Sequence, residues 1–96
     1  MRIVDWRETA RADLLNIVDY ISDDSPKAAQ LLKDNIEQKV SKLVAFPLRY
    51  RRGRVPGTRE MVVSPNYVVV YTFSADTITV LRVLHAAQQW PQITKN

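Results

Sequence analysis

A cluster of arginines between residues 49 and 59 is the part of this chain with the clearest chemical meaning. The segment RYRRGRVPGTR holds five arginines and no acidic residue. Guanidinium groups bind phosphate and carboxylate oxygens, because their N–H donors match the geometry of these anions. Three interpretations stay open: phosphate contacts to nucleic acid, docking on an acidic protein surface, or a solvated basic loop. The candidate binding residues are Arg49, Arg51, Arg52, Arg54, Arg59 and, beyond the cluster, Tyr67.

The two glycines of the chain, Gly53 and Gly57, both lie inside this cluster. We predict that they form turns with positive φ that aim the arginines. The glycine spacings of dinucleotide-binding and P-loop motifs are absent. We therefore expect no nucleotide cofactor, and no other cofactor is indicated.

A second candidate for chemistry is His85, the single histidine of a chain without cysteine. Its intrinsic pKa near neutrality suits a general acid or base, although a lone histidine at a strand end more often has a structural role. Regular alternation groups Arg82 with Val80 and Leu84, and His85 with Leu81, on opposite faces of a strand. Both can serve one site only if the strand bulges or has already ended. We expect Arg82 to pair with an acid of the helices, and we expect no metal site.

The bulk composition indicates one small globular domain. The chain has 96 residues, of which 46% are hydrophobic and 25% are charged, and this leaves little room for a second core. The absence of cysteine fits a reducing cytoplasm. The longest apolar run, Tyr67 to Tyr71, is too short to span a bilayer, and the first residues do not resemble a signal peptide. We expect a cytoplasmic protein with no membrane partner.

Charge is distributed unevenly along the chain. Residues 1–37 contain eight acidic and five basic residues, whereas residues 38–96 contain nine basic and two acidic residues. The net charge of +4 therefore comes entirely from the second part. This polarity favours an acidic partner for residues 38–96.

The first half of the chain predicts a strand followed by two helices. Ile3–Trp6 is a short apolar run that reads as a strand, and a helical stripe begins after Glu8, capped by Thr9 or a neighbour. Ser25-Pro26 marks the start of a second helix, which we expect Pro47 to end. The short connection predicts an antiparallel helical hairpin. The apolar stripes are Ala10, Leu14, Ile17, Val18 and Ile21, and then Ala29, Leu32, Ile36, Val40 and Leu43.

The second half predicts three strands joined by turns: Thr58–Val63, Tyr67–Phe73 and Thr77–Leu84. The middle one is apolar throughout, as a strand buried on both faces would be. The order β-α-α-β-β-β is that of an α+β domain, with an N-terminal helical hairpin packed on one face of an antiparallel sheet. We expect one domain over residues 1–91 and a polar tail over residues 92–96.

This order, together with three local strings, resembles the RelE/ParE superfamily of bacterial toxins. The strings are GRVPGTRE at residues 53–60, PNYVVVY at residues 65–71, and VLRVLH at residues 80–85 running into QWP at residues 89–91. The resemblance implies a small cytoplasmic toxin of a type II toxin–antitoxin module, held inactive in a hetero-oligomer with its cognate antitoxin. Toxin released from the antitoxin would arrest growth.

The superfamily implies two unrelated routes to growth arrest. RelE-like members are endonucleases that cut mRNA on the ribosome, and ParE-like members poison DNA gyrase without cutting anything. The nucleases carry an arginine directly after the aromatic residue of the central strand, whereas Val68 follows Tyr67 here. Residues 86–89 also lack the arginine and tyrosine that many of the nucleases use.

We therefore favour ParE-like inhibition of gyrase without catalysis by the chain itself. The alternative is a ribosome-dependent mRNA endonuclease with Arg59, Arg82 and His85 as catalytic candidates. A third reading is an inactive member that only binds an antitoxin.

Overall fold

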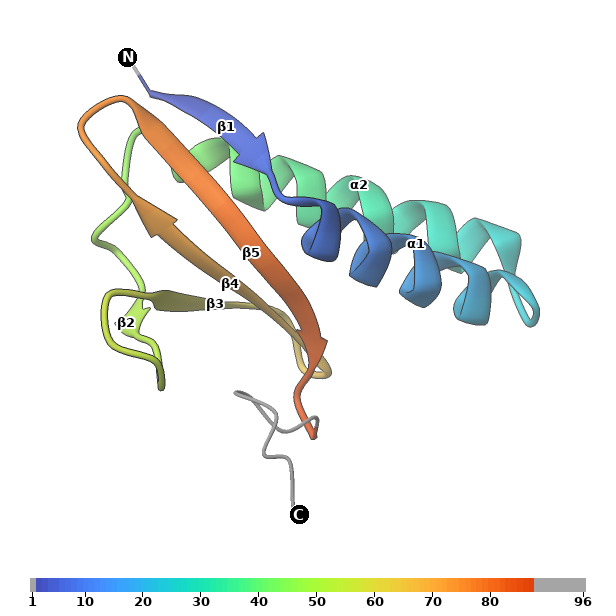
Figure 1. The fold of residues 1–96 in the computed structure, drawn as a ribbon. Coiled ribbons are helices and arrows are strands. Elements are labelled where there is room, and N and C mark those ends of the chain that lie inside the picture. Colours follow the sequence, from blue (N-terminus) through green and yellow to red (C-terminus); the bar gives the residue numbers. More distant parts are fainter. Residues whose placement is uncertain (1, 88–96) are drawn as a thin grey trace.

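A five-stranded sheet with two helices packed on one face makes up the fold in the computed structural model, which describes residues 2–87 (Figure 1). The predicted order β-α-α-β-β-β is confirmed, and a short additional strand lies within the arginine cluster. The elements are β1 (Ile3–Trp6), α1 (Glu8–Ser22), α2 (Pro26–Lys42), β2 (Arg51–Arg52), β3 (Arg59–Ser64), β4 (Tyr67–Phe73) and β5 (Thr77–His85).

The sheet is mixed, so the prediction of an antiparallel sheet was wrong. Its strand order is β1-β5-β4-β3-β2, and only the pair β1–β5 is parallel. The helical hairpin carries the chain from β1 to the far edge of the sheet. The three-stranded meander then brings β5 back alongside β1 in the same direction (Figure 1). Sequence periodicity identifies strands but not which distant strand becomes a neighbour.

The helix boundaries confirm one predicted cap and correct two other predictions. The Ser25 Oγ accepts the backbone N–H of Ala28 at 3.1 Å, as expected of an N-cap before proline. Thr9 does not cap α1, because that helix begins at Glu8 and the Thr9 hydroxyl donates to the Leu81 carbonyl instead. The second helix ends at Lys42 rather than at Pro47, and the backbone N–H groups of Leu43 to Ala45 make tighter i→i+3 bonds in place of α-helical bonds.

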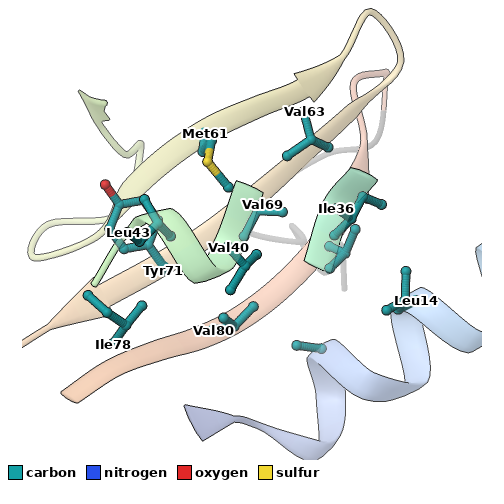
Figure 2. Packing of buried hydrophobic residues seen from close by; sticks show 12 residues of the cluster. Leu14, Ile36, Val40, Leu43, Met61, Val63, Val69, Tyr71, Ile78 and Val80 are labelled. Carbon is teal, nitrogen blue, oxygen red and sulfur yellow. The ribbon is translucent and has the colours of Figure 1, made fainter. Parts of the chain in front are cut away.

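The core lies between the helical hairpin and β3, β4 and β5 (Figure 2). Both predicted helix stripes contribute to it, and burial of this apolar surface is the main stabilising term of a domain this small. Val68 to Tyr71 of β4 are all at most 4% exposed, which confirms the prediction of a strand buried on both faces. The buried cluster consists of Ala10, Leu14, Ile36, Val40, Leu43, Met61, Val63, Val69, Tyr71, Ile78, Val80 and Val83.

A β-bulge interrupts the alternation of β5. Val80 is opposite Tyr71, but Arg82 is opposite the preceding residue Val70, so Leu81 is an extra residue in this strand. Consequently Val80 and Val83, three residues apart, both enter the core. The grouping of Arg82 with Val80 on one face, which assumed regular alternation, was therefore wrong.

Tyr71 fastens the segment after α2 to the middle of the sheet. It is fully buried, and its hydroxyl donates to the Pro47 carbonyl at 2.6 Å. Burial raises the pKa of Tyr71 to about 12, although the nearby charge of Arg59 opposes the rise. In the unfolded chain the hydroxyl ionises near its ordinary pKa of 10.0, so the unfolded state loses its proton first.

This difference predicts a loss of stability in alkali. The contribution of Tyr71 is intact below pH 10 and declines by about 1.4 kcal/mol per pH unit as the pH rises toward the folded pKa. Urea unfolding of the wild type and of Tyr71→Phe between about pH 9 and pH 11 measures it. The variant should start about 1 kcal/mol less stable and show a shallower decline, because the hydroxyl and its hydrogen bond are gone. Parallel declines in the two proteins would contradict this role of Tyr71.

Candidate functional site

The arginine cluster forms a short strand and a tight turn at the edge of the sheet. Arg51 is opposite Glu60, and Arg52 is opposite Arg59. The turn closes through the Gly53 N–H, which donates to the Thr58 carbonyl at 2.7 Å. The predicted positive φ is confirmed for Gly57, at 84°, and is wrong for Gly53.

Glycine is required at position 53 for a different reason, which is close approach. A Cβ atom there would lie 2.1 Å from the Thr58 Oγ1, which is far inside van der Waals contact. The Thr58 hydroxyl is in turn held by its bond to the Val55 carbonyl at 2.7 Å. Both glycines therefore shape the turn, one by its dihedral angle and one by its size.

One side of the cluster is partly neutralised by Glu60, which is 3% exposed. Its carboxylate accepts Arg51 Nη2 at 3.1 Å and the Arg54 backbone N–H at 2.9 Å, and Arg54 Nε lies 3.5 Å away. A buried carboxylate needs such partners because desolvation of an unpaired charge is costly. Two of the five arginines therefore already have an internal counter-ion.

The other side of the cluster carries Arg52 and Arg59. Successive residues of a strand point to opposite faces of the sheet. Arg52 and Arg59 therefore lie on the face opposite to Arg51 and Glu60. The Arg59 Nη1 donates to the Tyr50 carbonyl at 2.7 Å. Both arginines line an open cavity of about 440 Å³, whose wall includes the ring of Phe73.

The remaining predicted site residues lie in two places. Arg49 is exposed, and within residues 2–87 its side chain makes no hydrogen bond or ion pair. Tyr67, at the other end of β4, is the cross-strand partner of His85 in β5. Their rings meet edge to face, with 5.5 Å between the ring centroids. Arg59 is opposite Tyr71, four residues along β4 from Tyr67, which is about 13 Å along the strand.

Arg82 is held by α1, which confirms the predicted pairing with a helical acid. Its Nε and Nη2 donate to the two oxygens of Asp13 at 2.7 and 3.0 Å. This hydrogen bond raises the pKa of Arg82 above its ordinary value, against the effect of burial. Asp13 Oδ2 also accepts the backbone N–H of Val83 at 2.9 Å. Asp13 therefore satisfies both the guanidinium and the backbone of the bulge.

A separate, largely apolar groove of about 380 Å³ lies where α1 and α2 meet the end of β1. Its wall contains Trp6, Leu14 and Leu15, with Arg11 and Lys33 among its charged residues. Trp6 is partly buried against the core. Across residues 2–87, no three histidine or acidic residues are grouped so that they could hold a metal ion. None of the helices described is long and apolar enough to cross a membrane.

Comparison with protein families decides the classification of this fold and charge pattern. Residues 4–90 match the model of the ParE toxin of the type II toxin–antitoxin system parDE. The chain belongs to the ParE toxin family. This confirms the resemblance to the RelE/ParE superfamily, and the protein is a toxin of a type II toxin–antitoxin system.

Individual relatives of this ParE-family toxin agree with the assignment. It is 38% identical to Y4kP of Sinorhizobium fredii over 89 residues, 92% of each chain. It is 37% identical to toxin RelE2 of Caulobacter vibrioides over 90 residues, 92% of this chain and 99% of the relative. A solved structure of the chromosomal ParDE system from P. aeruginosa superimposes with a TM-score of 0.77 at 27% identity, over 88% of this chain and 96% of that one.

Sequence reasoning missed two residues of the site in this ParE-family toxin. Glu60 appeared only as the last residue of the string GRVPGTRE, and Phe73 only as the end of a predicted strand. Alternation in the predicted strand put Arg59 and Glu60 on opposite faces, which was the available signal that one acid divides the arginines. Which arginines lie beside that acid depends on the pairing of β2 with β3, and a strand of two residues has no periodicity to detect.

Proposed function

We propose that this ParE-family toxin arrests growth by binding DNA gyrase and inhibiting it, without catalysing a reaction, in the bacterial cytoplasm. The observation that carries the proposal is Val68. It follows Tyr67 in β4, where the nuclease resemblance calls for arginine, and it is 4% exposed. A buried valine can neither bind phosphate nor stabilise the charge of a cleavage transition state.

The positions of the other nuclease candidates support the same proposal. A catalytic set must converge on one reacting group within hydrogen-bonding distance. Arg59 is opposite Tyr71, about 13 Å along β4 from Tyr67, and Tyr67 is the residue that His85 of β5 faces. Arg82 is committed to Asp13. The cationic cluster is then better explained as a surface that docks on acidic protein.

A cognate antitoxin is the second partner that we propose. The solved ParDE system is the similar structure that favours it. Phe46 and Leu48, just before the arginine cluster, are 59% and 65% exposed, and apolar side chains of this size at the surface are typical of interfaces. We propose that an acidic antitoxin segment covers this surface in a hetero-oligomer. We also propose that the toxin domain spans residues 1–91.

The alternative function is mRNA cleavage on the ribosome, which the name of the relative RelE2 and the position of His85 favour. His85 is exposed, and its Nδ1 accepts the Ala87 backbone N–H at 3.1 Å. This local bond favours the structural role over catalysis. We expect His85→Gln to leave toxicity within about threefold of the wild type, because general catalysis by a side chain contributes about a hundredfold or more.

Growth curves after induction, with His85→Gln and the wild type at matched protein levels, measure this effect. Antitoxin binding and thermal unfolding of the purified variant establish that it is folded. Complete loss of toxicity in a folded variant that still binds antitoxin would favour the nuclease.

The proposed function predicts a specific sequence of events in cells. After induction, a reporter plasmid should lose negative supercoiling before growth stops, while mRNA stays uncut, and co-expression of the antitoxin should prevent both effects. Topoisomer gels and primer extension on the same samples measure the two. Cleaved mRNA with normal plasmid topology would exclude gyrase as the target.

A further inference from the structure

The side of the arginine cluster that Glu60 does not reach has an unusual charge arrangement. Arg52 and Arg59 are direct cross-strand partners, so both guanidinium groups stand on the same face of β2 and β3. Like charges in directly opposed positions destabilise a strand pair. An anion placed between them would turn this repulsion into two attractive contacts.

No anion of the described chain fills that place. The buried carboxylate of Glu60 lies on the opposite face with Arg51 and Arg54. The nearest contact of Arg59 is a neutral carbonyl, that of Tyr50, which orients the guanidinium but leaves its charge uncompensated. Within residues 2–87, Arg52 has no hydrogen-bond or ion-pair partner for its side chain, and no carboxylate lines the cavity between the two arginines.

The cavity also offers apolar surface beside the two charges. Phe73 and Pro56 form part of its wall. Arg2 stacks over Phe73, with its guanidinium carbon 5.7 Å from the ring centre, and donates to the Ser74 carbonyl at 2.8 Å. These contacts hold the aromatic wall in place. A ligand that suits this cavity has an acidic group next to an apolar one.

We propose that this cavity, the Arg52/Arg59 pocket, receives an acidic side chain of a protein segment, with a neighbouring apolar side chain against Phe73 and Pro56. In the cell we assign the segment to gyrase, and that assignment alone depends on the proposed function. Protein fits better than nucleic acid because phosphate tracking needs a row of unpaired cations. Here Arg51 and Arg54 share the carboxylate of Glu60, so these two are not unpaired cations.

A capped peptide of alternating glutamate and leucine, titrated into ¹⁵N-labelled toxin, tests the pocket without gyrase. The backbone N–H signals of Gly53, Gly57 and Thr58 should shift saturably. The glutamine–leucine peptide of equal length should leave them in place, because it lacks the carboxylates. Arg52→Glu should weaken binding about 30-fold or more, since truncating a paired charge at an interface costs about 2 kcal/mol or more.

Two further variants make the result interpretable. Arg52→Gln keeps most of the side chain and should also lose binding, which shows that loss of the positive charge is sufficient without an added negative charge. Lys27→Glu makes the same charge reversal in the first turn of α2, at the far end of the hairpin from β2 (Figure 1), and should bind like the wild type. Equal shifts with both peptides, absence of any shift, or preferential binding of a short DNA duplex at these signals would overturn the proposal.

The same proteins are then compared for binding to purified gyrase. If the wild type and Arg52→Glu inhibited gyrase equally well, the assignment of the pocket to gyrase would be refuted. The proposed function would then still stand. A wild type that binds the acidic peptide but never gyrase would refute the proposed function and leave the pocket standing. Loss of gyrase binding in Arg52→Glu, with Lys27→Glu unchanged, is the result that we expect.

Discussion

Replacing Glu60 with alanine should destabilise the domain by about 3 kcal/mol and disorganise the arginine cluster. The carboxylate accepts two hydrogen bonds and is 3% exposed. Without it, the Arg54 backbone N–H loses its acceptor, and four arginines between residues 51 and 59 repel one another. Desolvation of the carboxylate offsets part of its contribution, and the arginines can return to water. We therefore expect a loss below the upper range measured for buried ion pairs.

The loss should be local as well as global. Because β2 pairs with β3 through only two residue pairs, its amide hydrogens should exchange much faster in Glu60→Ala, while those of α1 and α2 keep their relative protection. Chemical unfolding and hydrogen exchange measure the two effects. Gyrase inhibition should weaken in parallel, because Arg52 and Arg59 lose their fixed spacing.

Glu37→Ala is the matched control for this variant. Glu37 pairs with Lys33 at 3.0 Å on the surface of α2, with both side chains at least 40% exposed. Exposed pairs of this kind contribute about 0.5 kcal/mol or less. If Glu60→Ala were no more destabilising than Glu37→Ala, Glu60 would not organise the cluster.

Asp13→Ala should destabilise the domain to a similar or larger extent, by about 3 kcal/mol, which lowers Tm by roughly 15 °C in a chain of this length. Its two oxygens accept three hydrogen bonds, two from Arg82 and one from the Val83 backbone. The side chains of Asp13 and Arg82 are 16% and 26% exposed. Solvent therefore screens this pair less than a surface pair.

The geometry of the bulge explains why the effect should be large. Thr9 and Asp13 are four residues apart on one face of α1. Thr9 bonds to the Leu81 carbonyl, and Asp13 bonds to the Val83 N–H. Helix side chains thus bind β5 backbone groups at the bulge, where the register with β4 is interrupted. Removing Asp13 frees both the bulge and the contact between α1 and β5.

Asp19→Ala, an acid-to-alanine change at an exposed position of the same helix, is the control. It should change the free energy of unfolding by about 0.5 kcal/mol or less. Asp13→Asn keeps an oxygen that can accept the Val83 N–H and should fall between the two. Thermal unfolding that ranks Asp13→Ala with Asp19→Ala would contradict the role of Asp13.

Periodicity and terminal signals sufficed to predict most of the elements. The alternation of apolar residues located β1, β4 and both helices to within a few residues, and Ser25-Pro26 marked the start of α2. These are local signals, since a cap or a stripe is readable within one or two turns. The residues that resembled the superfamily placed the chain in the correct toxin family.

The features that sequence reasoning missed all depend on contacts between distant segments. The parallel pairing of β1 with β5 joins residues 3–6 to residues 77–80. The backbone groups beside the bulge at Leu81 bond to side chains of α1, about 70 residues earlier. The division of the arginines into a side that shares the carboxylate of Glu60 and a side without an acid depends on β2, which is too short to predict. In each case the segment that makes the deciding contact is too distant in sequence, or too short, for the local pattern of apolar residues to reveal it.

The most direct test of the central claim compares two assays on one preparation of purified toxin: gyrase supercoiling of relaxed plasmid, and mRNA cleavage on programmed ribosomes. We predict that the wild type blocks supercoiling and leaves mRNA intact, and that added antitoxin restores supercoiling. Cleavage in the ribosomal A site with unimpaired gyrase would contradict the account. It would mean that residues other than an arginine at position 68 supply catalysis, and Arg82 and His85 would be the first to mutate.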